Sequence, residues 1–336
     1  MPPYPQDTSA RARFVIDRRE TWPAHDSWRH QGVIVEDERS ADGRPARTAT
    51  VLVTGRECPW RCVMCDLWRY TTPHETPRGA IPSQVAAARE ELRSRSETVT
   101  QLKLYNASSF FDPHAVPDDD YRPIAEALDG IERVVVESHP SLVGSRVDVL
   151  LDALSERARG DRRATRLEVA MGLETAHHDA LGRLNKRMTV DDFILAAGEL
   201  QRRGVDVRTF LLIHPPFVPA AEQQHWLRQS ILAAFSAGAS VVSLIPTRPG
   251  NGAMEALQAE GVFHPPQLED IERSLETAAA MVSSGRRIFV DLWDLERFSR
   301  CPHCFHARRD RMHAFNLDQR LHGMAPCTAC GLGAAS

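Results

Sequence analysis

All seven cysteines of this chain fall into two short-spaced sets, and these sets limit its fold and chemistry more than any other feature. Three lie within eight residues of one another in the run CPWRCVMC, and four form two C-x2-C pairs separated by 22 residues. The first set is Cys58, Cys62 and Cys65, and the second is Cys301, Cys304, Cys327 and Cys330. Three thiolates can hold a metal centre while one coordination position stays open, whereas four in two pairs tend to close a site. The spacing therefore predicts one reactive metal site and one structural site.

The composition favours a soluble protein with one large domain and a small appendage. The 336 residues are 42% hydrophobic and 26% charged, with a net charge of -4. No apolar run approaches the roughly 18 residues of a membrane span, and the N-terminal residues lack the apolar segment of a signal peptide. We therefore expect a cytoplasmic protein without membrane association, where reducing conditions favour metal binding over disulfides.

The charge distribution excludes some functions and leaves one local exception. The net charge is too acidic for a protein that binds nucleic acid over its whole surface. Arginines nevertheless crowd around the second cysteine set. They are Arg286, Arg287, Arg297, Arg300, Arg308, Arg309, Arg311 and Arg320. No G-x-G-x-x-G or P-loop motif occurs, so nucleotide hydride transfer and phosphate transfer have no support.

Short runs rich in Val, Ile and Leu alternate with helical segments along most of the chain, as in parallel α/β folds. One helix start is marked by Thr189 and Asp192, which resemble a capping box. The predicted strands are 49–54, 101–105, 133–138, 167–173, 207–213 and 241–245, with 287–292 as a further candidate. Six successive βα units predict a parallel sheet with right-handed crossovers, either an open doubly wound sheet or an incomplete barrel.

The first cysteine set begins four residues after the first predicted strand. In both architectures the active site lies at the carboxyl ends of the strands, so these cysteines are expected there. We expect three segments: an irregular N-terminal extension at 1–47, the main domain at 48–294, and a C-terminal metal-binding appendage at 295–336. A four-iron cube needs four ligands, so three local thiolates would leave one iron open. The alternative is a zinc site that borrows a distant ligand.

The C-x3-C-x2-C motif after the first strand of a βα repeat resembles the radical S-adenosylmethionine (radical SAM) superfamily. The resemblance covers about residues 48–292 and implies a partial (β/α)6 TIM-like barrel. It also implies a [4Fe-4S] cluster whose open iron chelates SAM, and an external one-electron donor. Reductive cleavage of SAM then gives a 5′-deoxyadenosyl radical that takes a hydrogen from the substrate.

Two further stretches resemble one branch of this superfamily, which includes elongator-type tRNA-modifying enzymes and the radical SAM subunit of archaeosine synthase. They are Gly172-Leu-Glu-Thr175 and Asn185-Lys-Arg-Met-Thr189. The branch implies that Glu174 approaches SAM and that Lys186 meets its carboxylate. It favours a base or nucleoside as substrate, either in tRNA or free.

Other candidate SAM contacts follow from the resemblance. The run Asn106-Ala-Ser108-Ser109 departs from the Gly-Gly-Glu-type turn of the superfamily but still offers the polar groups of Asn106, Ser108 and Ser109. Met64 stands before the third cysteine, where the superfamily often has an aromatic residue near the adenine, and a thioether can pack there.

Further candidates lie at predicted strand ends. Glu137 and Ser138 end the third strand and are expected to face the site. His214, Thr247 and Arg248 follow the fifth and sixth strands and are candidates for contact with the substrate or the outer part of SAM.

The second cysteine set allows two interpretations. Its C-x2-C-G ending is typical of a zinc-ribbon knuckle, and a ribbon could dock RNA or a protein partner through the neighbouring arginines. Four thiolates could equally hold an auxiliary [4Fe-4S] cluster, which could support sulfur insertion into a nucleoside or other small metabolite. A function of another class is a zinc-ribbon nucleic-acid-binding protein with a non-catalytic barrel, although retention of all three barrel cysteines argues against it.

Overall fold

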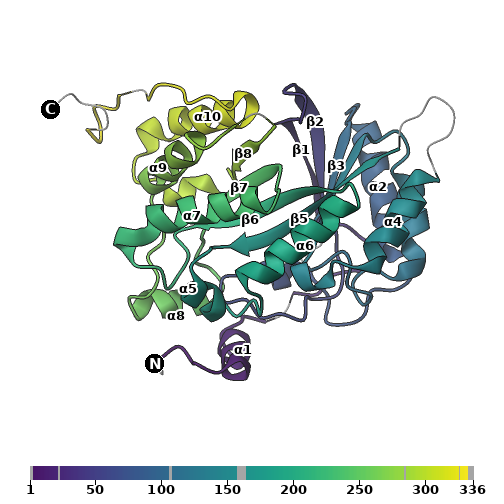
Figure 1. Ribbon diagram of the computed structural model, residues 1–336, viewed down its shortest axis with the longest axis horizontal. Coiled ribbons are helices and arrows are strands. Elements are labelled where there is room, and N and C mark those ends of the chain that lie inside the picture. The colour runs from purple at the N-terminus through teal and green to yellow at the C-terminus, as the bar shows by residue number, and fades with distance from the viewer. Residues whose placement is uncertain are drawn as a thin grey trace.

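The computed structural model describes residues 3–21, 23–105, 108–156, 164–283, 285–324 and 326–331. One sheet of eight strands, arranged in chain order, carries the fold (Figure 1). The strands are β1 (Gly32–Arg39), β2 (Pro45–Leu52), β3 (Gln101–Tyr105), β4 (Arg133–Glu137), β5 (Arg166–Glu174), β6 (Asp206–Ile213), β7 (Val241–Pro246) and β8 (Arg287–Val290). Within the described ranges, β1 and β2 are the only antiparallel pair, and each later neighbour pairs in parallel.

The strand order distinguishes the two predicted architectures. A doubly wound sheet reverses its order at a switch point, whereas this order runs without reversal from β1 to β8. The sheet curls into a half barrel, and no pairing between β8 and β1 closes it within the part of the chain that the structure describes. The predicted partial barrel is therefore confirmed.

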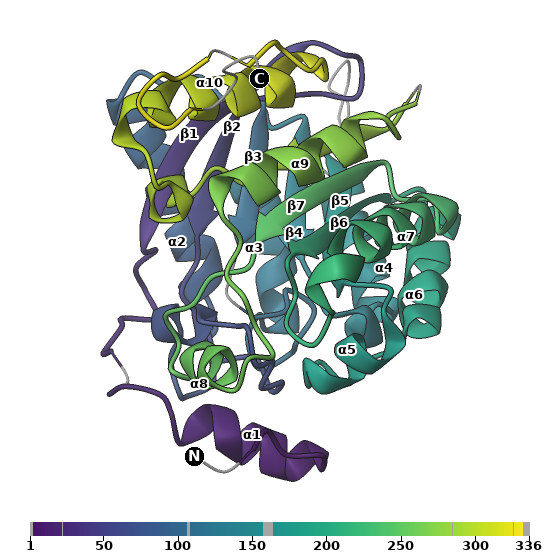
Figure 2. The ribbon, with the colours of Figure 1, turned by 90° about the vertical axis from the view of Figure 1, so that its left-hand side faces the viewer.

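Helices cover the convex side of the sheet (Figure 2). They include α2 (Ala80–Ser94), α3 (Tyr121–Ala127), α4 (Ser145–Ser155), α6 (Val190–Arg202), α7 (Gln223–Ser236) and α9 (Leu268–Ala279). Side chains along a strand therefore alternate between the helix-covered face and the concave face of the sheet. In β3, Leu102 and Leu104 belong to the main apolar core, whereas Lys103 lies on the opposite face. Thr189 and Asp192 form the predicted capping box at the start of α6. No helix among the described residues is long and apolar enough to cross a membrane.

All seven predicted strands are confirmed to within a few residues, but the expectation of irregular chain over residues 1–47 is wrong. This region contains α1 (Thr8–Ile16) and β1. The sequence of β1, GVIVEDER, is acidic in its second half and so does not look like a strand of a buried sheet. In the structure, however, the side chain of Glu38 turns inward and forms ion pairs with Lys103 and Arg208. Burial of charge therefore hid the strand pattern. The division of the chain at residues 47 and 294 remains a prediction.

The free edge of β8 is covered by α10 (Pro302–Asp318). The side-chain amide of Asn316 bonds the N–H and the carbonyl of Val290, at 2.9 and 2.8 Å. Gln319, just after the helix, does the same for Ile288, at 2.7 Å for both bonds. Two side-chain amides thus replace the missing neighbour strand, which is one way to protect an exposed sheet edge.

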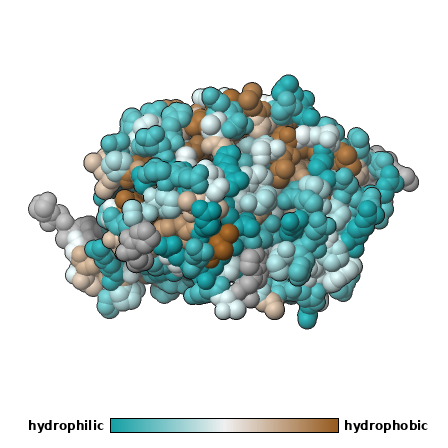
Figure 3. Space-filling model, turned by 90° about the horizontal axis from the view of Figure 1, so that it is seen from below, coloured by the Kyte–Doolittle hydropathy of each residue, from teal (hydrophilic) through white to brown (hydrophobic). Residues whose placement is uncertain are grey.

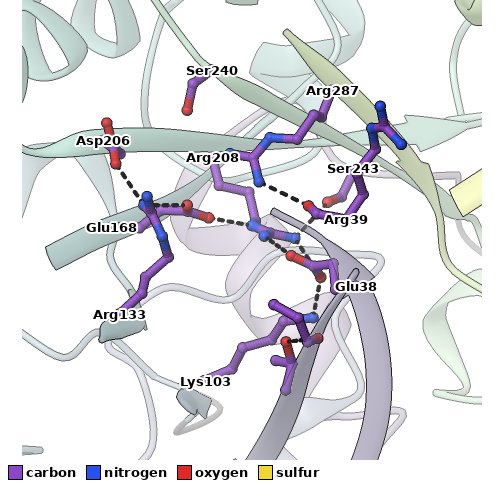
Figure 4. Close-up of polar contacts among 12 residues, drawn as sticks. Glu38, Arg39, Lys103, Arg133, Glu168, Asp206, Arg208, Ser240, Ser243 and Arg287 are labelled. Atoms are coloured by element: carbon purple, nitrogen blue, oxygen red, sulfur yellow. Dashed lines mark hydrogen bonds and ion pairs between the residues drawn. The ribbon is translucent and has the colours of Figure 1, made fainter. Parts of the chain in front are cut away.

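A buried network of charges fills the concave side of the sheet near the strand starts (Figure 4). Its members are Glu38, Lys103, Arg133, Glu168, Asp206 and Arg208. Arg208 Nε lies 2.6 Å from Glu168 Oε1, and Arg133 Nη1 lies 3.0 Å from Glu168 Oε2. Buried charges are tolerated when they are paired and hydrogen-bonded in this way. The network forms a floor across this part of the half barrel, and we expect a ligand site above it, toward the carboxyl ends of the strands.

Candidate active site and C-terminal metal site

The first cysteine set lies in the loop that follows β2, at the carboxyl end of the parallel strands. The three cysteines form no disulfide, and part of each residue is accessible. Burial raises the pKa of Cys58, Cys62 and Cys65 to about 12, so the metal-free thiols are protonated at neutral pH. A bound metal must displace these protons, because thiolates are the ligands.

Residues from distant parts of the chain hold the backbone of this cysteine loop. The N–H of Val63 donates to the carbonyl of Leu184 at 3.0 Å, and Asn185 Nδ2 donates to the carbonyl of Arg61 at 2.9 Å. Asn251 Nδ2 donates to the carbonyls of Val63 and Cys65, at 2.7 and 3.2 Å. The sequence predicted no role for Asn251, which lies in a Pro-Gly-Asn-Gly run after β7.

Glu174 and Lys186 form a buried ion pair beside the cysteine loop. Their side chains are 9% and 11% exposed, and Lys186 Nζ donates to Glu174 Oε1. Burial favours the neutral amine, but the negative charge of Glu174 outweighs it and raises the pKa of Lys186, which remains a cation. The charge of Lys186 also acts on Cys58 and Cys62. The structure therefore brings together the two residues that the sequence placed near SAM.

The backbone around this pair is strained. Glu174 has a φ of 66°, and the residues on either side of Lys186, Asn185 and Arg187, have φ values of 61° and 59°. Left-handed backbone is costly for residues other than glycine and concentrates at functional sites. A Cβ on Gly172 would lie 2.0 Å from Glu174 Oε1 and 2.3 Å from Lys186 Nζ. A larger residue at this position would therefore push the two side-chain ends out of their present positions.

A second polar group joins the ends of β3 and β4 to the same site. Ser109 Oγ lies 3.1 Å from Ser138 Oγ and accepts from the N–H of His139 at 3.0 Å. His139 Nε2 lies 3.0 Å from the carbonyl of Lys186, and its ring stacks on Trp60 with centroids 3.9 Å apart. Burial, followed by the charge of Lys186, lowers the pKa of His139 to about 4, so it is neutral. Sequence reasoning missed His139, although it directly follows a predicted strand.

Four other residues were predicted to contact SAM, and the structure describes three of them. Asn106 lies outside the described residues. The hydroxyl of Ser108 is buried and has no hydrogen-bond partner among the residues described. Met64 is half-buried against the main core, and Glu137 is half-buried at the end of β4. The SAM contacts of all four stay predictions.

The two later strand ends hold three further candidates. His214, which follows β6, has a φ of 56°, and burial lowers its pKa. The hydroxyl of Thr247 is buried and unpartnered among the described residues. Arg248 instead turns toward the segment after β8, where its Nη2 lies 2.7 Å from Asp291 Oδ2.

The second cysteine set forms one compact site. Cys301 Sγ lies 3.9 Å from Cys327 Sγ, Cys304 Sγ lies 3.8 Å from Cys330 Sγ, and all four lie within 4.8 Å of one another. The first pair begins helix α10, whereas the second lies in a turn near the chain end. A hydrogen bond from the backbone of Cys304 lowers the pKa of Cys301 to about 7, which favours a thiolate ligand.

Several arginines near this site are committed to ion pairs. Arg308 Nη2 lies 2.6 Å from Glu272 Oε2, and Arg311 Nη2 lies 2.8 Å from Glu276 Oε1, so both tie α10 to α9. Arg287 is buried and donates to the carbonyl of Arg39 at 3.0 Å. These three side chains stabilise the fold, which reduces the basic surface that the sequence suggested for RNA.

No protein-family model matches the chain. It is 29% identical over 178 residues to archaeosine synthase subunit beta of Thermococcus kodakarensis, a match that covers 52% of each chain. It is 27% identical over 251 residues to archaeosine synthase subunit beta of Methanosarcina acetivorans, covering 71% of this chain and 69% of that one. The chain thus spans about half the length of the first of these relatives.

A solved structure of Elp3 from Methanocaldococcus infernus is similar with a TM-score of 0.49 and 15% identity, covering 70% of this chain and 59% of that one. This likeness is too weak to support any inference about activity. The chain is therefore similar in sequence to archaeosine synthase subunit beta, and its three-cysteine loop after the first parallel strand and its half-barrel sheet agree with the resemblance to the radical SAM superfamily.

Proposed function

We propose that this protein is a radical SAM enzyme that modifies a base or nucleoside. When bound, a [4Fe-4S] cluster and SAM supply a one-electron cleavage of the carbon–sulfur bond and a 5′-deoxyadenosyl radical. Cys58, Cys62 and Cys65 hold this cluster and leave one iron open. The electron comes from an external donor.

The observation that carries the proposal is the Glu174–Lys186 pair beside a three-cysteine loop. The amino-acid end of SAM carries an ammonium and a carboxylate. Lys186 offers a cation for the carboxylate, and Glu174 offers an acceptor for the ammonium. A zwitterionic ligand can therefore replace the contacts that the two side chains make with each other.

Other residues support this arrangement. Asn185 and Asn251 fix the backbone of the cysteine loop, and His139 fixes the carbonyl of Lys186. The buried hydroxyls of Ser108 and Thr247 are available for hydrogen bonds to SAM or the substrate. The burial of the site protects a radical from water.

A base or nucleoside is the substrate class that the sequence relatives favour. They are named archaeosine synthase subunit beta, and that name also favours a partner subunit for this chain. Whether the substrate is tRNA or a free molecule can be measured directly. A tRNA substrate requires binding that weakens steeply with salt, because phosphate contacts release counterions.

We further propose that the C-terminal cysteines hold zinc. Zn–S bonds of about 2.3 Å in a tetrahedron put neighbouring sulfurs about 3.8 Å apart. The distances of 3.9 and 3.8 Å match this edge. In an auxiliary cube each thiolate would bind a different iron and stand farther from the others. The geometry thus favours zinc over a sulfur-donating cluster, the second candidate.

The experiment that tests both proposals is metal analysis of anaerobically purified protein beside a Cys327→Ala/Cys330→Ala variant. We expect about four irons and about one zinc per chain, with only the zinc lost from the variant. About eight irons, halved in the variant, would favour the auxiliary cluster and sulfur insertion. Iron absent after reconstitution, or no 5′-deoxyadenosine on reduction with SAM, would contradict the radical mechanism and leave a non-catalytic zinc protein.

A further inference from the structure

A segment from the N-terminal region, residues 3–19, lies across the carboxyl ends of the strands. We call it the N-terminal strap. Its helix α1 lies at the same end of the molecule as α5 (His178–Arg183) and α8 (Ala253–Ala259), which follow β5 and β7 (Figures 1 and 2). Seen from this end, the surface is mainly hydrophilic with separate apolar patches (Figure 3).

The first end of the strap is anchored by Tyr4. This side chain is only 4% exposed, and its hydroxyl donates to the carbonyl of Arg183 at 2.6 Å. Its ring lies 5.0 Å from that of Phe217, which follows β6, and 5.1 Å from that of Phe14 in the strap itself.

Arg11 holds the middle of the strap. Its Nη1 donates to the carbonyl of Gly182 at 2.8 Å, and its Nε donates to the carbonyl of Pro5 at 2.9 Å. The guanidinium also lies over the ring of Tyr4, 5.6 Å from its centroid. One cation therefore fixes both the strap and its first anchor.

The second end of the strap rests on the segments after β7 and β2. A Cβ on Gly252 would lie 2.2 Å from the carbonyl oxygen of Arg18, so the two backbones touch. Arg19 Nη1 lies 2.8 Å from Glu57 Oε1, next to Cys58, and its guanidinium lies over Trp68. The strap thus contacts the segments that follow four parallel strands, β2, β5, β6 and β7.

We infer that the N-terminal strap is a size-selective cover over the radical site, and so helps to determine the substrate. A chain that bridges four strand ends obstructs a macromolecule at the mouth of the barrel. Each loop cysteine nevertheless keeps some accessible surface with the strap in place. A free nucleoside and SAM can pass beside the strap, whereas a base within an RNA reaches the site only when the strap is displaced. The inference deepens the proposed function, and it rests on the site's placement at this mouth.

The test compares two thiol reagents on the metal-free full-length protein, and so needs neither cluster nor SAM. Iodoacetamide is small, and a maleimide on a long polyethylene glycol chain is bulky. Mass spectrometry reports the rate at each cysteine, with the C-terminal cysteines as the internal reference. In the wild-type protein we expect iodoacetamide to modify the loop cysteines and the bulky maleimide to modify them slowly.

Two variants loosen the strap. Arg11→Ala removes the middle anchor, and Tyr4→Phe removes only the hydroxyl bond to Arg183. We expect Arg11→Ala to raise the bulky reagent's rate at the loop cysteines about tenfold relative to the reference, because charged hydrogen bonds contribute most to local closure. Arg13→Ala, an equal loss of charge at an exposed position of the same helix, is the control and should change nothing.

An unchanged ratio in Arg11→Ala and Tyr4→Phe would overturn the inference, as would an equal rise at all seven cysteines, which reports general unfolding. Neither result bears on the radical mechanism, which the metal analysis and SAM cleavage decide separately.

Discussion

Replacing Lys186 with methionine tests the central feature of the site, its buried ion pair. Methionine keeps most of the volume of the lysine but removes the charge, so Glu174 is left as a buried carboxylate. Both side chains are about one-tenth exposed, so little water compensates for the loss. Breaking a buried pair on one side costs about 3 to 5 kcal/mol, and we expect a loss in this range.

Urea unfolding of the metal-free protein measures this loss. The stability that Lys186 contributes is present below its unfolded pKa of 10.5 and is lost as the pH rises through its higher folded value, so the deficit should be constant around neutral pH and shrink only above 10.5. The double variant Glu174→Leu/Lys186→Met removes both charges and should recover most of the stability, yet it should not bind SAM in equilibrium dialysis. A loss below about 1 kcal/mol in Lys186→Met, or a double variant that still binds SAM, would refute the reasoning.

Three further outcomes are expected. Gly172→Ala should abolish SAM binding with little loss of helix content by circular dichroism, because its Cβ would displace Glu174 and Lys186. Glu38→Gln should lower the free energy of unfolding by about 3 kcal/mol at neutral pH. Burial raises the pKa of the Glu38 carboxyl, but Arg208 and Lys103 outweigh it and lower this pKa. The stability that Glu38 contributes is therefore present above pH 4.5, and the difference in unfolding free energy between wild type and variant should shrink as the pH falls below 4.5. Asn251→Ala should lose iron faster during anaerobic gel filtration than wild type, because two hydrogen bonds to the cysteine loop, each contributing about 1 kcal/mol, are removed.

The parallel strands were predictable because each is a short buried run that needs no partner to be recognised. In β3, Leu102 and Leu104 carry the signal even though Lys103 interrupts it. The strand β1 was not predictable in the same way, because Glu38 reads as a surface residue until Lys103 and Arg208, far along the chain, are known to meet it. Pairing between distant charges is a property of the fold and not of a local pattern.

The same distinction applies to the site. The cysteine spacing is local, so the sequence predicted the four-cysteine group that the structure brings together, whereas the metal-ligand role of the three loop cysteines stays a prediction. Asn251, Asn185 and His139 act through backbone carbonyls in other loops, and nothing in their own neighbourhood predicts those contacts. The helix that begins after Cys301 was equally hidden, because the C-x2-C spacing suits a turn as well as a helix start.

The charged floor explains why ligand chemistry belongs at the strand ends rather than deeper in the half barrel. Glu168 is held by both Arg133 and Arg208, so no single ligand can replace its contacts without leaving a buried charge unpaired. Glu174, by contrast, has Lys186 as its one ion-pair partner within the described part of the chain. A ligand that carries both charges can exchange with that pair at little net cost, because each side chain receives an equivalent partner. The floor stays intact during this exchange, so the barrel can admit a zwitterion at its mouth while its interior remains fixed.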